Sequence, residues 1–70
     1  MLTGRIQRLE RYRGLGIIKS TEGKKLLFYR RQLQGAVFDS LREGQNVEFE
    51  FSQSPKGLRA VKIKLVEERR

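Results

Sequence analysis

The chain has 70 residues and a formal net charge of +8, and it contains no Cys and no His. This length allows a single domain with a small core, since a chain of this size removes only roughly 60% of its unfolded surface from water. The two missing residue types exclude disulfides, thiolate chemistry, imidazole catalysis and zinc sites built from the usual ligands. We therefore expect no metal and no cofactor.

The positive charge is concentrated in the first half of the chain. Residues 1–35 hold nine Lys or Arg against two Glu, a net charge of +7, whereas residues 36–70 carry +1. Such a concentration is typical of nucleic-acid-binding proteins, in which cations neutralise phosphates and release counterions. It also occurs on solvated faces that only keep a protein soluble. No amphipathic helix is visible that would present the charge to a membrane, so we expect no membrane partner.

The start of the chain, MLTGRIQRLERYR, has no uninterrupted apolar run and is charged from Arg5 onward. It resembles neither a signal peptide nor a membrane span. We therefore expect a cytoplasmic protein.

Five short strands are predicted along the chain, separated by glycines and polar turns, and this spacing is typical of a small all-β domain. They cover residues 4–12, 15–20, 25–31, 46–52 and 59–66. Between the third and fourth strands, residues 32–41 lack strand alternation and predict a long connection with a helical turn. Closure into a barrel hides the edges of so short a sheet. We expect one domain over residues 1–66, followed by a charged tail at 67–70 that frays.

The fourth and fifth strands alternate between apolar and polar residues, so each has one face for the core. These core faces are Val47, Phe49 and Phe51 in the fourth strand and Val61, Ile63 and Leu65 in the fifth.

The second and third strands break this alternation because they are apolar on both faces. If Ile18, Leu26 and Phe28 point into the core, four other side chains point outward: Leu15, Ile17, Leu27 and Tyr29. The cations expected around this patch are Arg8, Arg13, Lys25 and Arg30. An exposed apolar patch with a cationic rim indicates a binding surface. The alternative is that both faces are buried, under residues 32–41 or in a dimer.

Four segments of the chain match the motifs of one known family. GRIQRLERYRGLGII is similar to the pattern Gly-x-Val-Lys-Trp-Phe-Asn-x-x-Lys-Gly-Phe-Gly-Phe-Ile, and FDSLREGQNVEF to Phe-x-Ser-Leu-x-Glu-Gly-Gln-x-Val-x-Phe. KLLFY and PKGLRAVKI match two shorter segments. From Gly4 to about Val66 the chain therefore resembles the cold-shock domain, which binds single-stranded nucleic acid. The resemblance implies a five-stranded antiparallel OB-fold barrel with a longer connection between strands 3 and 4.

The departures from the family pattern fall together on its binding face, where the family presents aromatic rings for base stacking. The resemblance places four residues at stacking positions on the second and third strands: Leu15, Ile17, Leu27 and Tyr29. Arg8 stands in place of an exposed Trp, and Arg30 replaces a further aromatic residue. The rings that remain for stacking are expected to be Tyr29 and Phe38. Because stacking is worth about 1–3 kcal/mol per base, this loss of rings shifts binding toward electrostatics.

The leading hypothesis is a binding module for single-stranded RNA or DNA, and the resemblance implies an RNA chaperone or a regulator of transcription or translation. The residues expected to form its surface are the apolar Leu15, Ile17, Leu27, Tyr29 and Phe38 and the cationic Arg8, Arg13, Arg30, Lys56 and Arg59. The alternative is a cold-shock fold that has lost nucleic-acid binding. In that case Leu15, Ile17 and Leu27 form a dimer or protein interface, since an apolar centre with an Arg rim also describes protein interfaces.

No group of residues in the sequence indicates catalysis or a small-molecule substrate. Glu48 and Glu50 have no apparent acid–base partner, and Ser40 has no His to activate it. Gly14-x-Gly16 is too short for a phosphate loop and instead indicates a close approach of the backbone. Tyr12 is expected to be a turn residue that packs on the surface.

Overall fold

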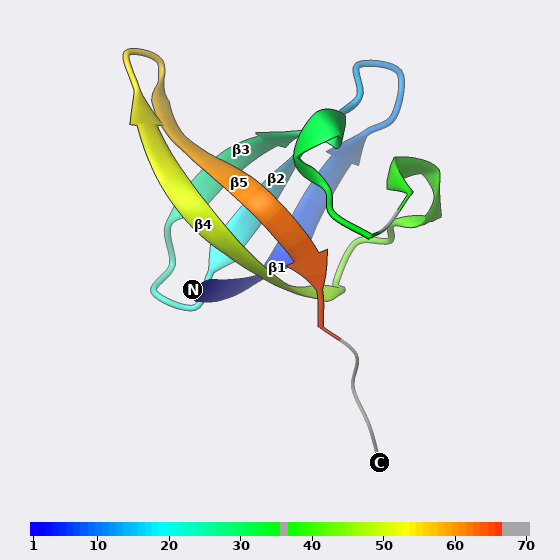
Figure 1. Ribbon diagram of the computed structural model, residues 1–70, viewed down its shortest axis with the longest axis horizontal. Coiled ribbons are helices and arrows are strands. Elements are labelled where there is room, and N and C mark those ends of the chain that lie inside the picture. The colour runs from blue at the N-terminus through cyan, green and yellow to red at the C-terminus, as the bar shows by residue number, and fades with distance from the viewer. Residues whose placement is uncertain (36, 67–70) are drawn as a thin grey trace.

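The computed structural model describes residues 1–35 and 37–66, which form a closed five-stranded barrel (Figure 1). The strands are β1 (Leu2–Glu10), β2 (Leu15–Ser20), β3 (Lys25–Tyr29), β4 (Asn46–Ser54) and β5 (Gly57–Leu65). They follow one another around the barrel in the order β1-β2-β3-β5-β4. The pairs are antiparallel except for β3 and β5, which close the barrel in parallel. The predicted fold class is confirmed.

The long connection between β3 and β4 contains two short 3₁₀ turns, η1 (Arg30–Gln32) and η2 (Phe38–Ser40). A parallel bridge joins Leu33 to Ile63 of β5, so the connection lies against the barrel. The structure therefore confirms the predicted long connection. The charged tail predicted at 67–70 lies outside the described residues.

The observed strand bounds differ from the predicted bounds mainly at the ends. β1 starts and ends two residues earlier than predicted, and β3 stops at Tyr29 because the next residues enter the η1 turn. β4 and β5 both extend to the predicted turn at 54–57. There the Ser54 hydroxyl donates to the Gly57 carbonyl (3.0 Å) and accepts from the Lys56 amide (3.3 Å), which fixes this tight hairpin.

The core contains apolar side chains from all five strands and from the connection. Its buried members are Ile6, Ile18, Leu26, Phe28, Phe38, Leu41, Val47, Phe49, Ala60 and Ile63. Gly16 makes room for the largest of them: a Cβ at this position would lie 2.6 Å from the Phe28 ring and 2.8 Å from the Arg8 carbonyl oxygen. This contact explains the second glycine of Gly14-x-Gly16 as a close approach, as the sequence indicated.

The prediction that Phe51 belongs to the core is wrong. Its side chain is 56% exposed, whereas Phe49, two residues earlier on β4, is fully buried. β1 pairs with β4 only from Asn46 to Phe49, so Phe51 lies beyond the end of β1, where the β4–β5 hairpin projects from the barrel (Figure 1). The alternation of β4 is as predicted, but the barrel supplies no layer of side chains to cover this ring.

No helix within residues 1–35 and 37–66 has the length and apolar character needed to cross a membrane. The cytoplasmic location stays a prediction.

The difference between the two phenylalanines is testable by urea unfolding followed by circular dichroism. Phe49→Leu should lower the free energy of unfolding by about 1–2 kcal/mol, because it removes packed volume from a closed core. Phe51→Leu should change it by less than about 0.5 kcal/mol, as is usual for exposed positions. Equal losses in the two variants would show that Phe51 is covered in solution.

Candidate nucleic-acid interface

Four of the predicted site residues form a continuous row across four strands. Arg8 of β1 pairs with Ile17 of β2, Ile17 pairs with Leu27 of β3, and Leu27 pairs with Arg59 of β5. Paired residues present their side chains to the same face of a sheet. Two arginines therefore flank two aliphatic side chains on the outer face of the barrel.

A second row lies one pleat away on the same face. Leu15 of β2 pairs directly with Tyr29 of β3, and Glu10 of β1 pairs with Leu15. Together Leu15, Ile17, Leu27 and Tyr29 form one apolar surface, which we call the platform. Each platform residue is half-buried rather than fully exposed, which refines the expectation of an open patch.

A bulge in β1 turns Arg8 onto the platform face. Ile6 pairs with Ile18 and points into the core, and strict alternation would point Arg8 inward as well. The register instead shifts between Ile6 and Arg8, so that Gln7 is an extra residue opposite β2. A bulge of this kind reverses the faces of the residues that follow it.

A second bulge, in β5, turns Arg59 onto the platform face. Ile63 is buried, so strict alternation would point Val61 and Arg59 inward. The register of β4 and β5 shifts between Glu48 and Glu50, which gives β5 one residue more, and Lys62 there has a φ of 52°. As a result Ala60 takes the core position and Val61 is half-buried on the other face, which corrects the prediction that Val61 shares the face of Ile63.

Tyr29 also lies in a groove of about 490 Å³ at one end of the platform. The cations that line this basic groove are Arg13, Arg30, Arg31, Lys56 and Arg59. They come from the β1–β2 turn, the η1 turn and the β4–β5 hairpin. Four of the five were predicted as site residues. Arg31 is the exception, because the sequence pattern predicts a strand over 25–31 and indicates no role for this residue.

Cation–π contacts order the arginines of the basic groove. The guanidinium carbons of Arg59 and Arg31 lie 5.0 and 5.8 Å from the centroid of the Tyr29 ring, respectively. A cation–π contact uses no hydrogen bond of the guanidinium, so its N–H donors remain available to a ligand. The ring of Tyr29 on the platform is therefore in contact with two arginines.

Gly14 leaves room for the side chain of Arg30, the first residue of η1, in the groove. Its φ is +66°, and a Cβ there would lie 2.9 Å from Cδ of Arg30. The Arg30 amide donates to the Gly14 carbonyl (2.8 Å), and its guanidinium carbon lies 5.9 Å from the centroid of the Phe38 ring. A side chain at position 14 would therefore collide with Arg30, which explains the first glycine of Gly14-x-Gly16.

Not every arginine near the site is available for a ligand. Nε of Arg8 lies 2.9 Å from a carboxylate oxygen of Glu10, so part of its charge is neutralised on the platform edge. Arg11 donates to the carbonyl oxygens of Asp39 (3.2 Å) and Leu41 (2.8 Å), which fastens the long connection to the β1–β2 turn. Residue type and position in the sequence did not reveal either pairing.

The prediction that Phe38 offers a ring on the binding face is not met in this structure. The side chain is 3% exposed, and its ring centroid lies 6.2 Å from that of Phe28 in the core. The η2 turn points it inward, where it closes one end of the barrel. Tyr12 is more exposed than predicted: it was expected to pack on the surface, but its side chain is fully exposed.

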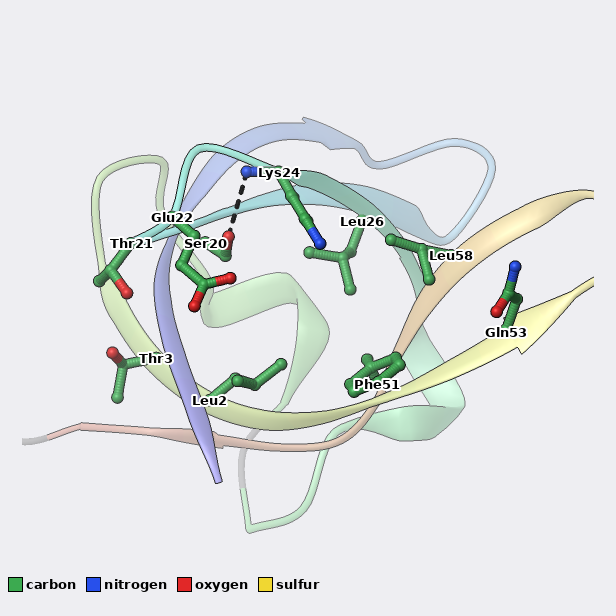
Figure 2. Close-up of a pocket in the computed structure, with 10 residues that line it drawn as sticks. All are labelled: Leu2, Thr3, Ser20, Thr21, Glu22, Lys24, Leu26, Phe51, Gln53 and Leu58. Atoms are coloured by element: carbon green, nitrogen blue, oxygen red, sulfur yellow. Dashed lines mark hydrogen bonds between the residues drawn. The ribbon is translucent and has the colours of Figure 1, made fainter.

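The other end of the barrel holds a separate cavity of about 390 Å³ (Figure 2). Its apolar lining comes from Leu2, Leu26, Phe51 and Leu58, and the β2–β3 turn forms part of its polar rim. None of the predicted site residues lines this cavity. The platform and the basic groove are therefore the site that the structure assembles from the predicted residues.

The fold and this surface define a small barrel with an apolar, cation-flanked binding face, and comparison with known proteins identifies its family. The model of the 'Cold-shock' DNA-binding domain matches residues 2–66. The chain belongs to the cold-shock domain family, a family of nucleic-acid-binding domains rather than enzymes. Proteins of this family bind single-stranded nucleic acid, and the predicted family membership is confirmed.

Several relatives match over nearly their whole length. The cold shock-like protein CspC of Buchnera aphidicola is 36% identical over 63 residues, which are 89% of this chain and 91% of that protein. The probable cold shock protein A of Mycolicibacterium smegmatis is 34% identical over 67 residues, 94% of this chain and all of that protein. The solved structure of Drosophila Unr CSD456 matches with a TM-score of 0.77 and 24% identity, over 94% of this chain and 26% of that chain, and supports the fold.

The β5 bulge predicts an unusual response to glycine. Positive φ costs a side chain with a Cβ about 1 kcal/mol, so Lys62→Gly should raise the free energy of unfolding by about 0.5–1 kcal/mol. Lys62→Val should lower it by about 1–2 kcal/mol, because β-branched residues rarely adopt this conformation. The matched control is Lys64→Gly on the same strand, which should destabilise by about 1 kcal/mol. A loss of stability in Lys62→Gly would contradict the bulge.

Proposed function

We propose that this chain binds single-stranded RNA or DNA without catalysis, using the platform and the basic groove as one surface. The observation that carries the proposal is the position of Tyr29, which belongs to both: it pairs with Leu15 on the platform and lies among five cations in the groove. Membership of the cold-shock family supports it. The cellular role would be that of an RNA chaperone or a regulator of transcription or translation.

The platform suits the bases and the basic groove suits the phosphates. Half-buried Leu15, Ile17 and Leu27 present apolar surface that can cover the face of a base, although aliphatic side chains lack the π contribution of a ring. Arginine guanidinium groups can stack on bases as well as neutralise phosphate. With one ring on the platform and five cations beside it, we infer that charge contributes more than stacking.

A dimer through Leu15, Ile17 and Leu27 has no observation in its favour. A two-fold symmetric interface brings the same surface of two copies together. Because Arg8 and Arg59 flank the aliphatic residues in one row, a symmetric pair would place cations of both copies close together. Their repulsion opposes association.

The proposal predicts distinct effects of charge and apolar surface, measured by fluorescence anisotropy with a labelled single-stranded heptanucleotide. If all five groove cations contact phosphates, log K should fall against log salt with a slope of roughly −3.5, at about −0.7 for each phosphate. Lys56→Ala should make this slope shallower by about 0.7. Leu27→Ala should weaken binding about fivefold, because it removes about 1 kcal/mol of apolar contact, and leave the slope unchanged.

The matched control for charge is Lys64→Ala, which removes one cation outside the basic groove and should leave the slope unchanged. Thermal melts of each variant separate loss of binding from loss of fold. If the wild type does not bind at low salt, the proposed function is wrong. Binding without salt dependence would contradict the role of the basic groove.

A second prediction concerns the carboxylate on the platform edge. Glu10→Gln removes a negative charge and releases Arg8, so affinity should rise about threefold and the salt slope should steepen by up to about 0.7. Glu50→Gln is the matched control, since Glu50 also faces a cation, Lys62, at 4.0 Å, but lies outside the platform and the groove. Equal effects of the two substitutions would show that only the net charge of the chain matters.

A further inference from the structure

We propose that Arg59 selects guanine in the bound strand by donating two hydrogen bonds to its O6 and N7 atoms. This inference rests on the proposed function and names the base that the surface prefers. It depends on three observations: which arginines near the site have free donors, which groove cation is held in place, and which of them lies beside the platform.

Arg59 has free donors. Its guanidinium carbon lies 5.0 Å from the centroid of the Tyr29 ring, and among the described residues its N–H groups make no hydrogen bond or ion pair. By contrast, Arg8 is paired with Glu10, and Arg11 donates to backbone carbonyls of the long connection. The donors of Arg59 are therefore available to a ligand.

Arg59 is also the most constrained cation of the basic groove. It is half-buried, whereas Arg13, Arg30, Arg31 and Lys56 are exposed. It lies near the start of β5, is paired with Ser52 of β4 and with Leu27 of β3, and its guanidinium contacts the Tyr29 ring. A constrained side chain loses little conformational entropy on binding, and arginine loses less for each hydrogen bond than lysine does. The four exposed cations suit phosphates, which tolerate varied geometry.

The position of Arg59 places its donors where a base is expected. The row from Arg8 through Ile17 and Leu27 ends at Arg59. Its guanidinium carbon lies 5.0 Å from the ring centroid of Tyr29, a platform residue, so the group lies at the platform edge. A base that covers Leu27 therefore turns one of its edges toward Arg59. Arg59 therefore selects the base, while the neighbouring cations hold the phosphate backbone of the strand.

Guanine matches the donor geometry of this residue. The guanidinium fork makes two parallel hydrogen bonds, and guanine presents the acceptors O6 and N7 side by side. On the same edge adenine alternates donor and acceptor, thymine offers one carbonyl beside a methyl group, and cytosine offers a donor. In a single strand no neighbouring chain covers this edge. We expect one well-placed guanine to tighten binding about tenfold.

The experiment compares three heptanucleotides in anisotropy titrations at one salt concentration: heptathymidine, the same strand with a central guanine, and that strand with 7-deazaguanine. The 7-deaza base keeps O6 and the ring surface but lacks the N7 acceptor. For the wild type, guanine should bind about tenfold tighter than thymine, and 7-deazaguanine should lose most of that gain. Arg59→Lys keeps the charge without the fork and should abolish the difference, and Tyr29→Leu should do the same.

Arg13→Lys is the matched control and should keep the preference for guanine, because Arg13 is an exposed groove residue. Equal affinity of the wild type for the guanine and 7-deazaguanine strands would overturn the inference while leaving the proposed function intact. A preference for guanine that persists in Arg59→Lys would also overturn it. Failure of the wild type to bind any of the three strands would instead refute the proposed function itself.

Discussion

The candidate interface depends on two interruptions of strand alternation. Side chains alternate between the two faces of a strand, so a core residue at one position fixes the face of every residue of the same parity. Bulges at Gln7 in β1 and near Lys62 in β5 each add one residue and so reverse the faces of the residues beyond them. Because of them, Ile6 and Ile63 fill the core while Arg8 and Arg59 lie outside, on either side of the platform. The strained φ of Lys62 is the structural cost of this arrangement.

Hydrogen bonds and ion pairs within the protein determine which arginines near the site can bind a ligand. The chain carries 16 Lys and Arg residues, but only some of them face the site with free donors. Arg11 fastens the long connection and Arg8 is paired with Glu10, whereas Arg59 and Arg31 contact the Tyr29 ring, which leaves their N–H donors available. Net charge attracts a polyanion from a distance, and these contacts determine where and how the bound strand is held.

The barrel fold and the platform could be predicted from the sequence, because the period-two pattern of apolar residues and the turn residues closely determine a small barrel. The platform followed from two strands that are apolar on both faces, and Leu15, Ile17, Leu27 and Tyr29 do lie together. Three features escaped prediction for physical reasons. Bulges leave no clear local signal, so Val61 was placed on the wrong face. The exposure of Phe51 depends on where β1 starts, and the burial of Phe38 depends on how a 3₁₀ turn meets the core.

The most direct test of the account is an amide chemical-shift titration of the ¹⁵N-labelled protein with a single-stranded heptanucleotide. We expect shifts that saturate together and cluster on β2, β3 and the lining of the basic groove, with those of Ile17, Leu27, Tyr29 and Arg59 among the largest. The amides of Thr3, Thr21 and Glu22, which line the cavity at the opposite end of the barrel, should stay unchanged. Shifts centred on that cavity, or none at all, would contradict the claim that platform and groove form one nucleic-acid-binding surface.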